Sequence, residues 1–357
     1  MDMYFRLKPE CYLILGTTKS IIYNLLAKES IWLDEKNTDI LIKSENNNIV
    51  SNNEDTLKKL EEEGWGCFYS KKIYIEKLRI TNMFNRDRMW KAAPYINTAT
   101  LHLTNNCNLS CSFCKDTFCA TCTVIDKNDK ELNKEQWFKV LDDLLYFGTK
   151  AVIFTGGEAS LKEDFNEIIN YSISKGFIVS VHTNGLKLIE NLPKKVFLAV
   201  SLFNENDLQR IRKYYGSREN VTLITFNKLN KAIKNWKIVC VTKDSSCVNI
   251  KSMKNTNLER FFSKKLGDEC LGGKITITSN GDVVPCLGKK NQKLSNIIED
   301  GISQTIKKLH DEVWTISIDD VKDRKCTKCE FRYLCTACGK VEPEKQCSYD
   351  LRCGQWN

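Results

Sequence analysis

The cysteines of this chain are numerous and unevenly spaced. The sequence of 357 residues contains 17 cysteines, of which five lie between Cys107 and Cys122 and eight between Cys270 and Cys353. A disulfide scaffold is typical of small secreted domains, whereas this chain is long and its first ten residues lack the basic and apolar segments of a secretory signal. Clustered thiols in a reducing compartment indicate metal binding. We therefore expect a cytoplasmic protein that holds metal through two cysteine-rich segments.

The rest of the composition narrows the class of protein. Lys and Arg total 54 against 45 Asp and Glu, a net charge of +9, but no block of five basic residues occurs. Charge that is spread in this way is typical of a solvated surface rather than of a nucleic-acid interface. No apolar run approaches the ~18 residues that a membrane helix needs. We therefore expect two or three domains, no membrane partner and no nucleic-acid partner.

The middle of the chain alternates between predicted strands and helices. The strands are predicted over residues 100–104, 151–155, 177–183, 196–202, 221–226 and 236–241, and the helices over 134–147, 163–175 and 207–215. The helix over 134–147 has an apolar stripe (Trp137, Val140, Leu141, Leu144 and Leu145), with Asn133 and Gln136 placed for a capping box. Such repeats predict an α/β fold with a parallel sheet, either a partial barrel or a doubly wound sheet. In both architectures the chemistry lies at the carboxyl ends of the strands.

The N-terminal and C-terminal regions lack the alternating strands and helices of the middle of the chain. Residues 1–95 are predicted to form a small α+β module, with a helix over 54–63 and a strand over 73–80, and carry no catalytic constellation. Beyond residue 255 the helical signal fades, and we expect this cysteine-rich tail to depend on metal for its fold. We therefore expect three parts, over residues 1–95, 96–254 and 255–357.

The first cysteine motif directly follows the first strand of the repeats. It runs Cys107-Asn-Leu-Ser-Cys111-Ser-Phe-Cys114. Three thiolates at this spacing can each bind one iron of a [4Fe–4S] cluster and leave the fourth iron open to another ligand. Cys119 and Cys122 follow at C-x2-C spacing, so a zinc knuckle that uses four of the five cysteines is the alternative.

This motif, with Phe113 before its last cysteine, resembles that of the radical SAM superfamily. The resemblance implies a partial (β/α)6 barrel and a [4Fe–4S] cluster held by Cys107, Cys111 and Cys114 as the catalytic cysteines. It also implies that the open iron binds the amino and carboxylate groups of S-adenosyl-L-methionine (SAM). Reductive cleavage of SAM would then give a 5′-deoxyadenosyl radical that removes a hydrogen atom from the substrate.

Three segments at the ends of later strands resemble SAM-binding segments of that superfamily. They are Thr155-Gly156-Gly157-Glu158, His182-Thr183-Asn184-Gly185 and Ser201. We expect the two glycines to let backbone approach the ligand and the Glu158 carboxylate to suit its ammonium group. The chain departs from relatives after Ser201, where Phe203-Asn204 stands in place of Asp-Gly. Arg210, Arg212 and Arg218 are equal candidates for holding the SAM carboxylate.

The C-terminal cysteines resemble the SPASM extension of these enzymes. The resemblance implies two auxiliary [4Fe–4S] clusters, hence three clusters in all. It assigns Cys270, Cys286 and Cys338 to the first, and Cys326, Cys329, Cys335 and Cys353 to the second, with Cys347 competing for the last place. No cysteine stands just before Cys270, so Cys240 and Cys247 are the remaining candidates for a fourth ligand, and the first auxiliary cluster is expected to keep an open iron. A pair of four-cysteine zinc sites is the alternative.

The resemblance implies a maturase of a ribosomally synthesised precursor peptide. A winged-helix-like module over residues 1–95 would bind the leader of that peptide by strand addition, and a flavodoxin- or ferredoxin-type protein would donate electrons.

Among the reactions of such maturases we favour a thioether crosslink, because an open iron would bind and orient a peptide thiolate. Carbon–carbon crosslinking and epimerisation are alternatives, the latter using a thiol of Cys119, Cys122, Cys240 or Cys247. Oxidation of a sulfatase residue is disfavoured by Leu287, which stands where that branch has its aspartate, and a zinc-ribbon nucleic-acid-binding protein is the alternative from another class.

Overall fold

The computed structural model divides the chain into two compact units. The first unit joins residues 1–90, 246–269 and 316–357, and the second joins residues 91–245 and 270–315. The structure describes residues 2–51, 54–79, 96–111, 114, 122–125, 130–225, 236–240, 257–267, 270–320, 325–335, 349–350 and 355–356. The predicted division into three functional parts, with boundaries near residues 95 and 254, stays a prediction.

The second unit is built on one sheet, which has nine strands within the described residues. Six parallel strands stand side by side in chain order: β7 (Thr98–His102), β8 (Ala151–Thr155), β9 (Ile178–Thr183), β10 (Phe197–Leu202), β11 (Val221–Thr225) and β12 (Lys237–Cys240). The predicted α/β fold with a parallel sheet is confirmed. The consecutive order is that of a singly wound sheet, so the doubly wound alternative is wrong for these strands. Closure into a (β/α)6 barrel stays a prediction.

C-terminal residues extend this sheet beyond β7. The added strands are β13 (Lys274–Ile277), β14 (Asp282–Val284) and β15 (Ser295–Asn296). β13 pairs parallel to β7, and β14 and β15 continue antiparallel. Gly281 lies in the turn between β13 and β14 with φ +87°, a backbone conformation that glycine adopts without strain. Residues 274–296 therefore complete the sheet of the second unit.

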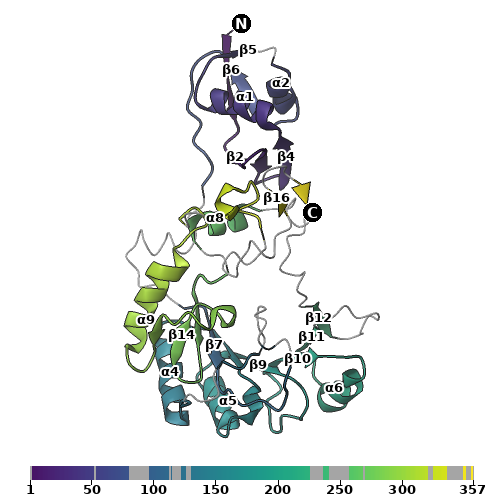
Figure 1. The fold of residues 1–357 in the computed structure, drawn as a ribbon, viewed down its shortest axis with the longest axis vertical. Coiled ribbons are helices and arrows are strands. Elements are labelled where there is room, and N and C mark those ends of the chain that lie inside the picture. Colours follow the sequence, from purple (N-terminus) through teal and green to yellow (C-terminus); the bar gives the residue numbers. More distant parts are fainter. Residues whose placement is uncertain are drawn as a thin grey trace. The chain divides into compact units, whose positions relative to one another are not determined.

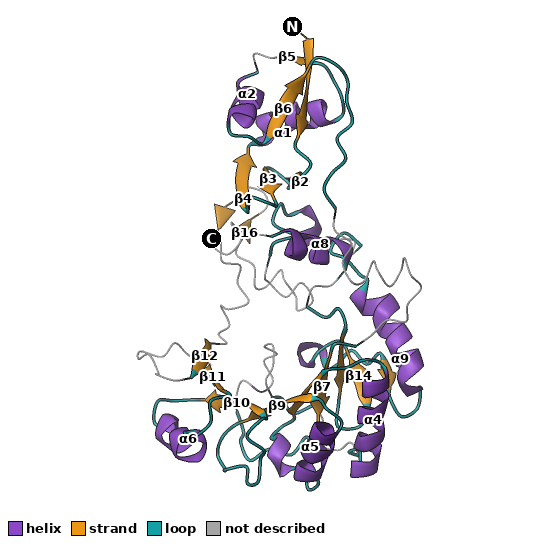
Figure 2. Ribbon diagram, turned by 180° about the vertical axis from the view of Figure 1, so that it is seen from behind, coloured by secondary structure: helices purple, strands orange, loops and turns teal. Residues whose placement is uncertain are grey.

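Among the described residues, three helices connect the parallel strands and lie along one face of the sheet (Figures 1 and 2). They are α4 (Lys134–Tyr146), α5 (Phe165–Ser174) and α6 (Asp207–Tyr215), with a short 3-10 helix η2 (Ala159–Leu161) before α5. The predicted capping box of α4 is confirmed, since the Asn133 side chain accepts from the Gln136 N–H and the Gln136 side chain accepts from the Asn133 N–H. α4 buries four of the five predicted stripe residues, whereas Leu145 is exposed.

The later part of the second unit contains further helical turns. They are η4 (Leu287–Lys289), α9 (Gly301–Leu309) and the π-helical η5 (His310–Trp314). In the first unit α8 spans Leu258–Leu266 and η6 spans Lys325–Lys328. The expectation that helices fade beyond residue 255 is therefore wrong, because α8 and α9 bury apolar residues on one face only and were missed as short amphipathic helices.

The N-terminal residues of the first unit form two three-stranded antiparallel sheets within the described ranges. One has β5 (Val50–Ser51), β1 (Asp2–Leu7) and β6 (Gly66–Tyr69), and the other has β2 (Cys11–Leu15), β3 (Ser20–Asn24) and β4 (Glu29–Leu33). The helices α1 (Glu35–Glu45) and α2 (Asp55–Glu62) share a core with them. A third, two-stranded sheet pairs β16 (Tyr349–Asp350) with β17 (Gln355–Trp356).

The predicted strand over residues 73–80 is wrong for the described residues 73–79, which have no regular secondary structure. Hydrogen bonds to residues 7–11 hold this segment in place of strand pairing. The Lys77 ammonium donates to the carbonyl oxygens of Leu7, Lys8 and Cys11, and the Leu78 N–H donates to Pro9 O. None of the helices in the described ranges combines the length and apolar character that crossing a bilayer requires.

Candidate active site

The three motif cysteines lie in the long loop that follows β7. Cys107, Cys111 and Cys114 are half-buried, and the Cys114 N–H donates to Cys111 O at 3.1 Å. Burial is the main cause that raises the pKa of Cys107 and of Cys111, and Cys114 raises both further by its proximity. Three neighbouring thiols are a donor set that fits a [4Fe–4S] cluster. In the part of the chain that the structure describes, no three His, Cys, Asp or Glu side chains are placed to hold a single metal ion.

The loop is closed by hydrogen bonds between its two ends. The Asn105 side-chain oxygen accepts from the Ile125 N–H at 2.8 Å. The buried His102 donates from Nε2 to Thr123 O at 2.6 Å, and burial lowers the pKa of His102, so this ring is neutral at physiological pH. The loop therefore leaves and returns at the carboxyl end of β7. Cys122 is half-buried near the return, while Phe113 and Cys119 lie outside the described residues.

The two glycines of Gly156-Gly157-Glu158 permit a close approach between two strand ends. A Cβ atom at Gly156 would lie 2.6 Å from Thr104 O, and one at Gly157 would lie 2.5 Å from Asn106 O. The Gly157 N–H donates to Thr104 O and the Glu158 N–H to Asn106 O, both at 2.8 Å. These glycines therefore fasten the start of the cysteine loop to β8. Their contact with SAM stays a prediction.

Glu158 joins the carboxyl ends of β8 and β9. Its side chain is only 2% exposed. Oε1 accepts from Ser160 Oγ at 2.6 Å and from Thr183 Oγ1 at 2.9 Å, and Oε2 accepts from the Asn184 N–H at 2.7 Å. A buried carboxylate with several donors is held in one orientation, as a ligand for an ammonium group requires.

Asn184 reaches from β9 into the cysteine motif itself. Its Nδ2 donates to Asn108 Oδ1 at 2.7 Å, and its side chain also hydrogen-bonds Cys107, which lowers the pKa of that thiol against the larger effect of burial. The predicted Cys107 and Asn184 are thus neighbours in space although they are far apart in sequence.

The other two predicted SAM-binding residues lie at the same edge. His182 is half-buried on β9 next to Thr183, and Ser201 is buried on β10. Val200 pairs with Thr183, so Ser201 lies one residue beyond it on the neighbouring strand. The predicted residues Gly156, Gly157, Glu158, His182, Asn184 and Ser201 all lie at the carboxyl ends of β8, β9 and β10.

The three candidate arginines have different surroundings in the structure. Arg218 donates to the carbonyl oxygens of Leu192, Pro193 and Val196, at the amino end of β10, which is the wrong edge for the predicted site. Arg212 is exposed on α6. Arg210 donates from Nε to Gly185 O at 3.1 Å and pairs with Asp207, so it is the arginine that contacts the end of β9.

Sequence reasoning missed Glu131, which supports the first residues of the loop. Its Oε1 accepts from Thr104 Oγ1 and from the Asn105 N–H, both at 2.7 Å, and its Oε2 lies 3.1 Å from the Lys162 ammonium. Burial alone would raise the pKa of Glu131, but these hydrogen bonds together lower it. No local pattern could have found this residue, because its partners are distant in sequence.

Comparison with known proteins agrees with this geometry. Residues 101–244 match the model of the Radical SAM superfamily. This stretch is a radical SAM domain. The chain therefore contains a domain of a superfamily that uses SAM and a [4Fe–4S] cluster. Among curated proteins, the S-adenosylmethionine-dependent nucleotide dehydratase of Selenomonas ruminantium is 29% identical over 143 residues, 37% of this chain and 48% of that protein.

Two further relatives resemble the chain in different ways. The sporulation killing factor maturation protein SkfB of Bacillus subtilis (strain 168) is 39% identical over 89 residues, 25% of this chain and 20% of that protein. The chain thus spans less than half the length of the curated relatives it matches. A crystal structure of Streptococcus suis SuiB has the same fold, with a TM-score of 0.50 and 15% identity over 95% of this chain and 96% of that chain.

The cysteines predicted for auxiliary clusters fall in both units. In the second unit, which contains the radical SAM domain, Cys270 is exposed and Cys286 is half-buried. In the first unit, Cys326, Cys329 and Cys335 are half-buried in one tight turn, where the Cys329 N–H donates to Cys326 O and the Cys335 N–H to Phe331 O. Cys338, Cys347, Cys353 and Cys247 lie outside the described residues, as does the side chain of Cys240. Both auxiliary ligand sets stay predictions.

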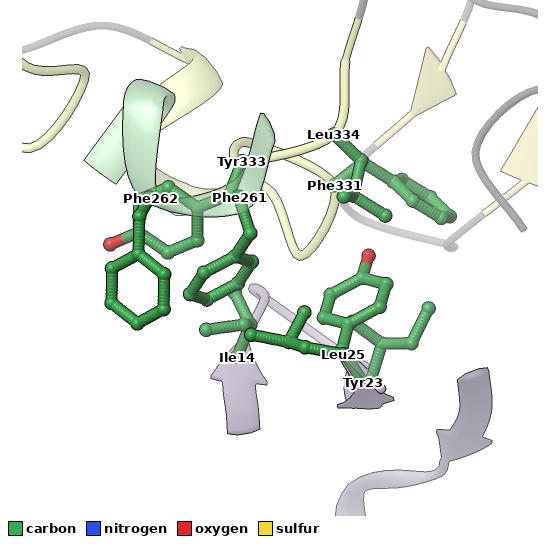
Figure 3. Close-up of a cluster of buried hydrophobic side chains, with 9 residues drawn as sticks. Ile14, Tyr23, Leu25, Phe261, Phe262, Phe331, Tyr333 and Leu334 are labelled. Atoms are coloured by element: carbon green, nitrogen blue, oxygen red, sulfur yellow. The ribbon is translucent and has the colours of Figure 1, made fainter. Parts of the chain in front are cut away.

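The turn over residues 325–335 contributes to a set of buried apolar side chains that we call the aromatic cluster (Figure 3). The cluster consists of Ile14 from β2, Ile21 and Tyr23 from β3, Leu25 from the turn after β3, Phe261 and Phe262 from α8, and Phe331, Tyr333 and Leu334 from the turn over residues 325–335. Cys329 packs against it, and burial is the main cause that raises the pKa of this thiol. Arg332 Nη1 also donates to Leu15 O at 2.8 Å. The N-terminal meander β2–β4 and the cysteine turn therefore share one core.

Proposed function

We propose that this enzyme is a SPASM-type maturase that installs a thioether crosslink in a ribosomally synthesised precursor peptide. The observation that carries the proposal is the hydrogen-bond network that joins the three-cysteine loop to Glu158 and Asn184 at the carboxyl ends of the strands. The cluster and SAM, when bound, supply the radical that removes a substrate hydrogen. Cys107, Cys111 and Cys114 would hold that cluster, while Glu158, His182, Asn184 and Ser201 would orient SAM.

Three findings support a peptide substrate. The name of SkfB describes a maturation protein, and the fold of SuiB matches nearly the whole chain. The cysteine turn over residues 325–335 also fits the predicted second auxiliary cluster, since three thiols lie in one tight turn, where burial mainly, and the nearby Cys335 and Cys326 in addition, raise the pKa of Cys329. The thioether is favoured over the other reactions because no cysteine precedes Cys270 at short range, which leaves an iron of the first auxiliary cluster to bind a peptide thiolate.

The N-terminal residues supply the peptide-binding module of this proposal. The sheet β5-β1-β6 and the helices α1 and α2 pack on one core, which a small binding module needs. Antiparallel edge strands can accept a further strand from an extended peptide. We propose that residues 1–95 bind the leader in this way in the cytoplasm, and that a flavodoxin- or ferredoxin-type protein delivers the electrons.

The test is a reaction with the peptides encoded beside the gene, made by synthesis. Anaerobic protein is incubated with SAM, dithionite and each peptide, and the product is weighed and fragmented. A thioether requires a loss of two hydrogens and a fragment in which cysteine sulfur is bonded to carbon, with one 5′-deoxyadenosine formed per crosslink. Loss of two hydrogens without a sulfur bond would show carbon–carbon crosslinking, and unchanged mass with an inverted residue would show epimerisation. Colourless protein that contains zinc would support the zinc-ribbon alternative and overturn the proposal.

A further inference from the structure

A lysine of the C-terminal segment contacts the loop that carries the three motif cysteines. Lys290 follows η4, four residues after Cys286, and is half-buried. Its ammonium donates to Thr123 Oγ1 at 3.1 Å and to Val124 O at 3.0 Å. These partners lie 167 and 166 residues earlier in the sequence, where the cysteine loop returns to the sheet.

Thr123 is the point at which the return of the loop is held. The residue is 2% exposed. Its N–H donates to Gly156 O at 3.0 Å, and its carbonyl accepts from His102 Nε2. Its hydroxyl, which accepts from Lys290, lies 3.2 Å from Cys114 O and donates there. Two consecutive hydrogen bonds therefore connect the Lys290 ammonium to the backbone of a motif cysteine.

The same C-terminal segment also holds the start of the loop. Asn105 Nδ2 donates to Ser279 Oγ at 2.9 Å, and the Leu132 N–H donates to Ser279 O at 2.7 Å. Ser279 and Lys290 thus brace the two ends of the cysteine loop from one segment. This segment therefore does more than present Cys270 and Cys286.

We propose that Lys290 is a positioning residue for the radical SAM cluster, acting through Thr123 on the loop that holds Cys114. The proposal rests on the proposed function for the identity of the cluster. A hydrogen bond from a charged donor is stronger than one between neutral groups, so the ammonium restrains the loop more than a neutral side chain would. The nearby positive charge also favours the more negative, reduced state of the cluster. Lys290 thereby connects the segment that contains Cys286 to the geometry and the reduction potential of the radical SAM cluster.

The test compares Lys290→Met with Lys293→Met in the full-length chain. Lys293 belongs to the same segment, is 53% exposed and pairs with Asp282, so its replacement removes the same charge without a contact to the loop. Amide exchange of residues 105–111 and 122–125 is measured in cluster-free protein, and the reduction potential of the cluster is measured by a titration followed by electron paramagnetic resonance. We expect about tenfold faster exchange of these amides in Lys290→Met only, together with a more negative potential. Lys290→Arg should restore the potential in part, since it keeps the charge but changes the donor geometry.

The results separate this inference from the proposed function. Equal exchange rates and potentials in Lys290→Met and Lys293→Met would show that Lys290 does not position the loop. If wild-type protein lacks an iron–sulfur signal, the proposed function fails, while the exchange rates still report on the Lys290 contact. If Lys290→Met does not fold, Thr123→Val removes the same hydroxyl bridge with little change in shape. That variant must show the faster exchange and Thr123→Ser must not, or the inference is wrong.

Discussion

The cysteine loop after β7 and the cysteine turn over residues 325–335 are held in different ways. The loop after β7 in the second unit is held by directional hydrogen bonds: Asn105 accepts from the Ile125 N–H, and Thr123 and Asn184 donate to Cys114 O and Asn108 Oδ1. The turn over residues 325–335 in the first unit also has hydrogen bonds, as from Arg332 to Leu15 O, but three of its apolar side chains, Phe331, Tyr333 and Leu334, are packed in the aromatic cluster. Hydrogen bonds restrain the distances and angles between particular atoms, whereas apolar packing fills space without such directional restraints. The first arrangement suits a site that must orient a small ligand, and the second suits a site that must be kept from water.

Removal of one thiol from each segment should give the largest and most unequal effects. Cys111→Ala should reduce 5′-deoxyadenosine formation to background, because the proposed SAM-binding cluster loses a ligand, with a loss of about four irons per chain. Cys326→Ala should lose iron and stability of the first unit but keep part of the SAM cleavage, since metal supports that turn. Chromatography of the nucleoside and iron analysis measure both, with Cys67→Ala as control. Normal SAM cleavage by Cys111→Ala would contradict the assignment.

A cavity in the aromatic cluster should destabilise the first unit strongly. Phe261 is fully buried, and its ring lies 5.1 Å from those of Tyr12 and Tyr333. Phe261→Ala should cost about 3–5 kcal/mol of unfolding free energy. Amide exchange of α8 and of residues 325–335 measures this, while the exposed Phe197 of the second unit provides the control Phe197→Ala. Unchanged exchange in the turn would show that the cluster does not support it.

A polar change in the second unit should have a smaller effect on stability and a clear effect on SAM binding. Glu158→Gln replaces one acceptor oxygen with an NH₂ group that faces the Thr183 hydroxyl or the Asn184 N–H. This should cost about 1–3 kcal/mol for the unsatisfied buried group and weaken SAM. Denaturant unfolding and calorimetric titration with SAM measure the two effects. The control is Glu163→Gln at an exposed position nearby, and equal SAM affinity of both variants would argue against the role of Glu158.

The smallest expected difference concerns pH. The pKa of Glu131 is lowered in the folded chain, so its contribution to stability is complete above its unfolded pKa of about 4.3 and is lost as the pH falls through the lower folded value. Burial lowers the pKa of Lys265, which lies over the rings of Tyr12, Phe261 and Tyr333, so stability of the first unit should rise as the pH increases towards about 10.4. Exchange rates at acidic and alkaline pH test both directions. Glu131→Gln should abolish the acid effect at residues 104–106, and Lys265→Met the alkaline effect at α8.

The elements that sequence predicts best are those with a local signal. The strand over Ala151–Thr155 and the helix over Asp207–Tyr215 agree with prediction residue for residue, because apolar runs and amphipathic periods are properties of adjacent residues. The pairing of β13 with β7 was not predicted, since it joins residues over 170 positions apart. Likewise α1 was not predicted, because few of its residues are apolar and its burial depends on the sheet that it covers.

The same distinction holds for the site. Cys107, Glu158 and Asn184 were predicted because each belongs to a motif of adjacent residues. Glu131, Thr123 and Lys290 belong to no motif, and their roles come from contacts between distant segments. The motifs therefore identify the groups predicted to bind the ligand, while the residues that hold those groups in place become visible only in three dimensions.

The position of β13 has a consequence for how the chain is made. A ribosome synthesises β7 long before β13, so the nascent chain presents one edge of β7 without its final neighbour. Unpaired edges of this kind promote association between chains. A translation product that stops before Lys274 would keep this edge and would also lack Ser279 and Lys290, so aggregation of such fragments in expression trials follows from the strand order itself.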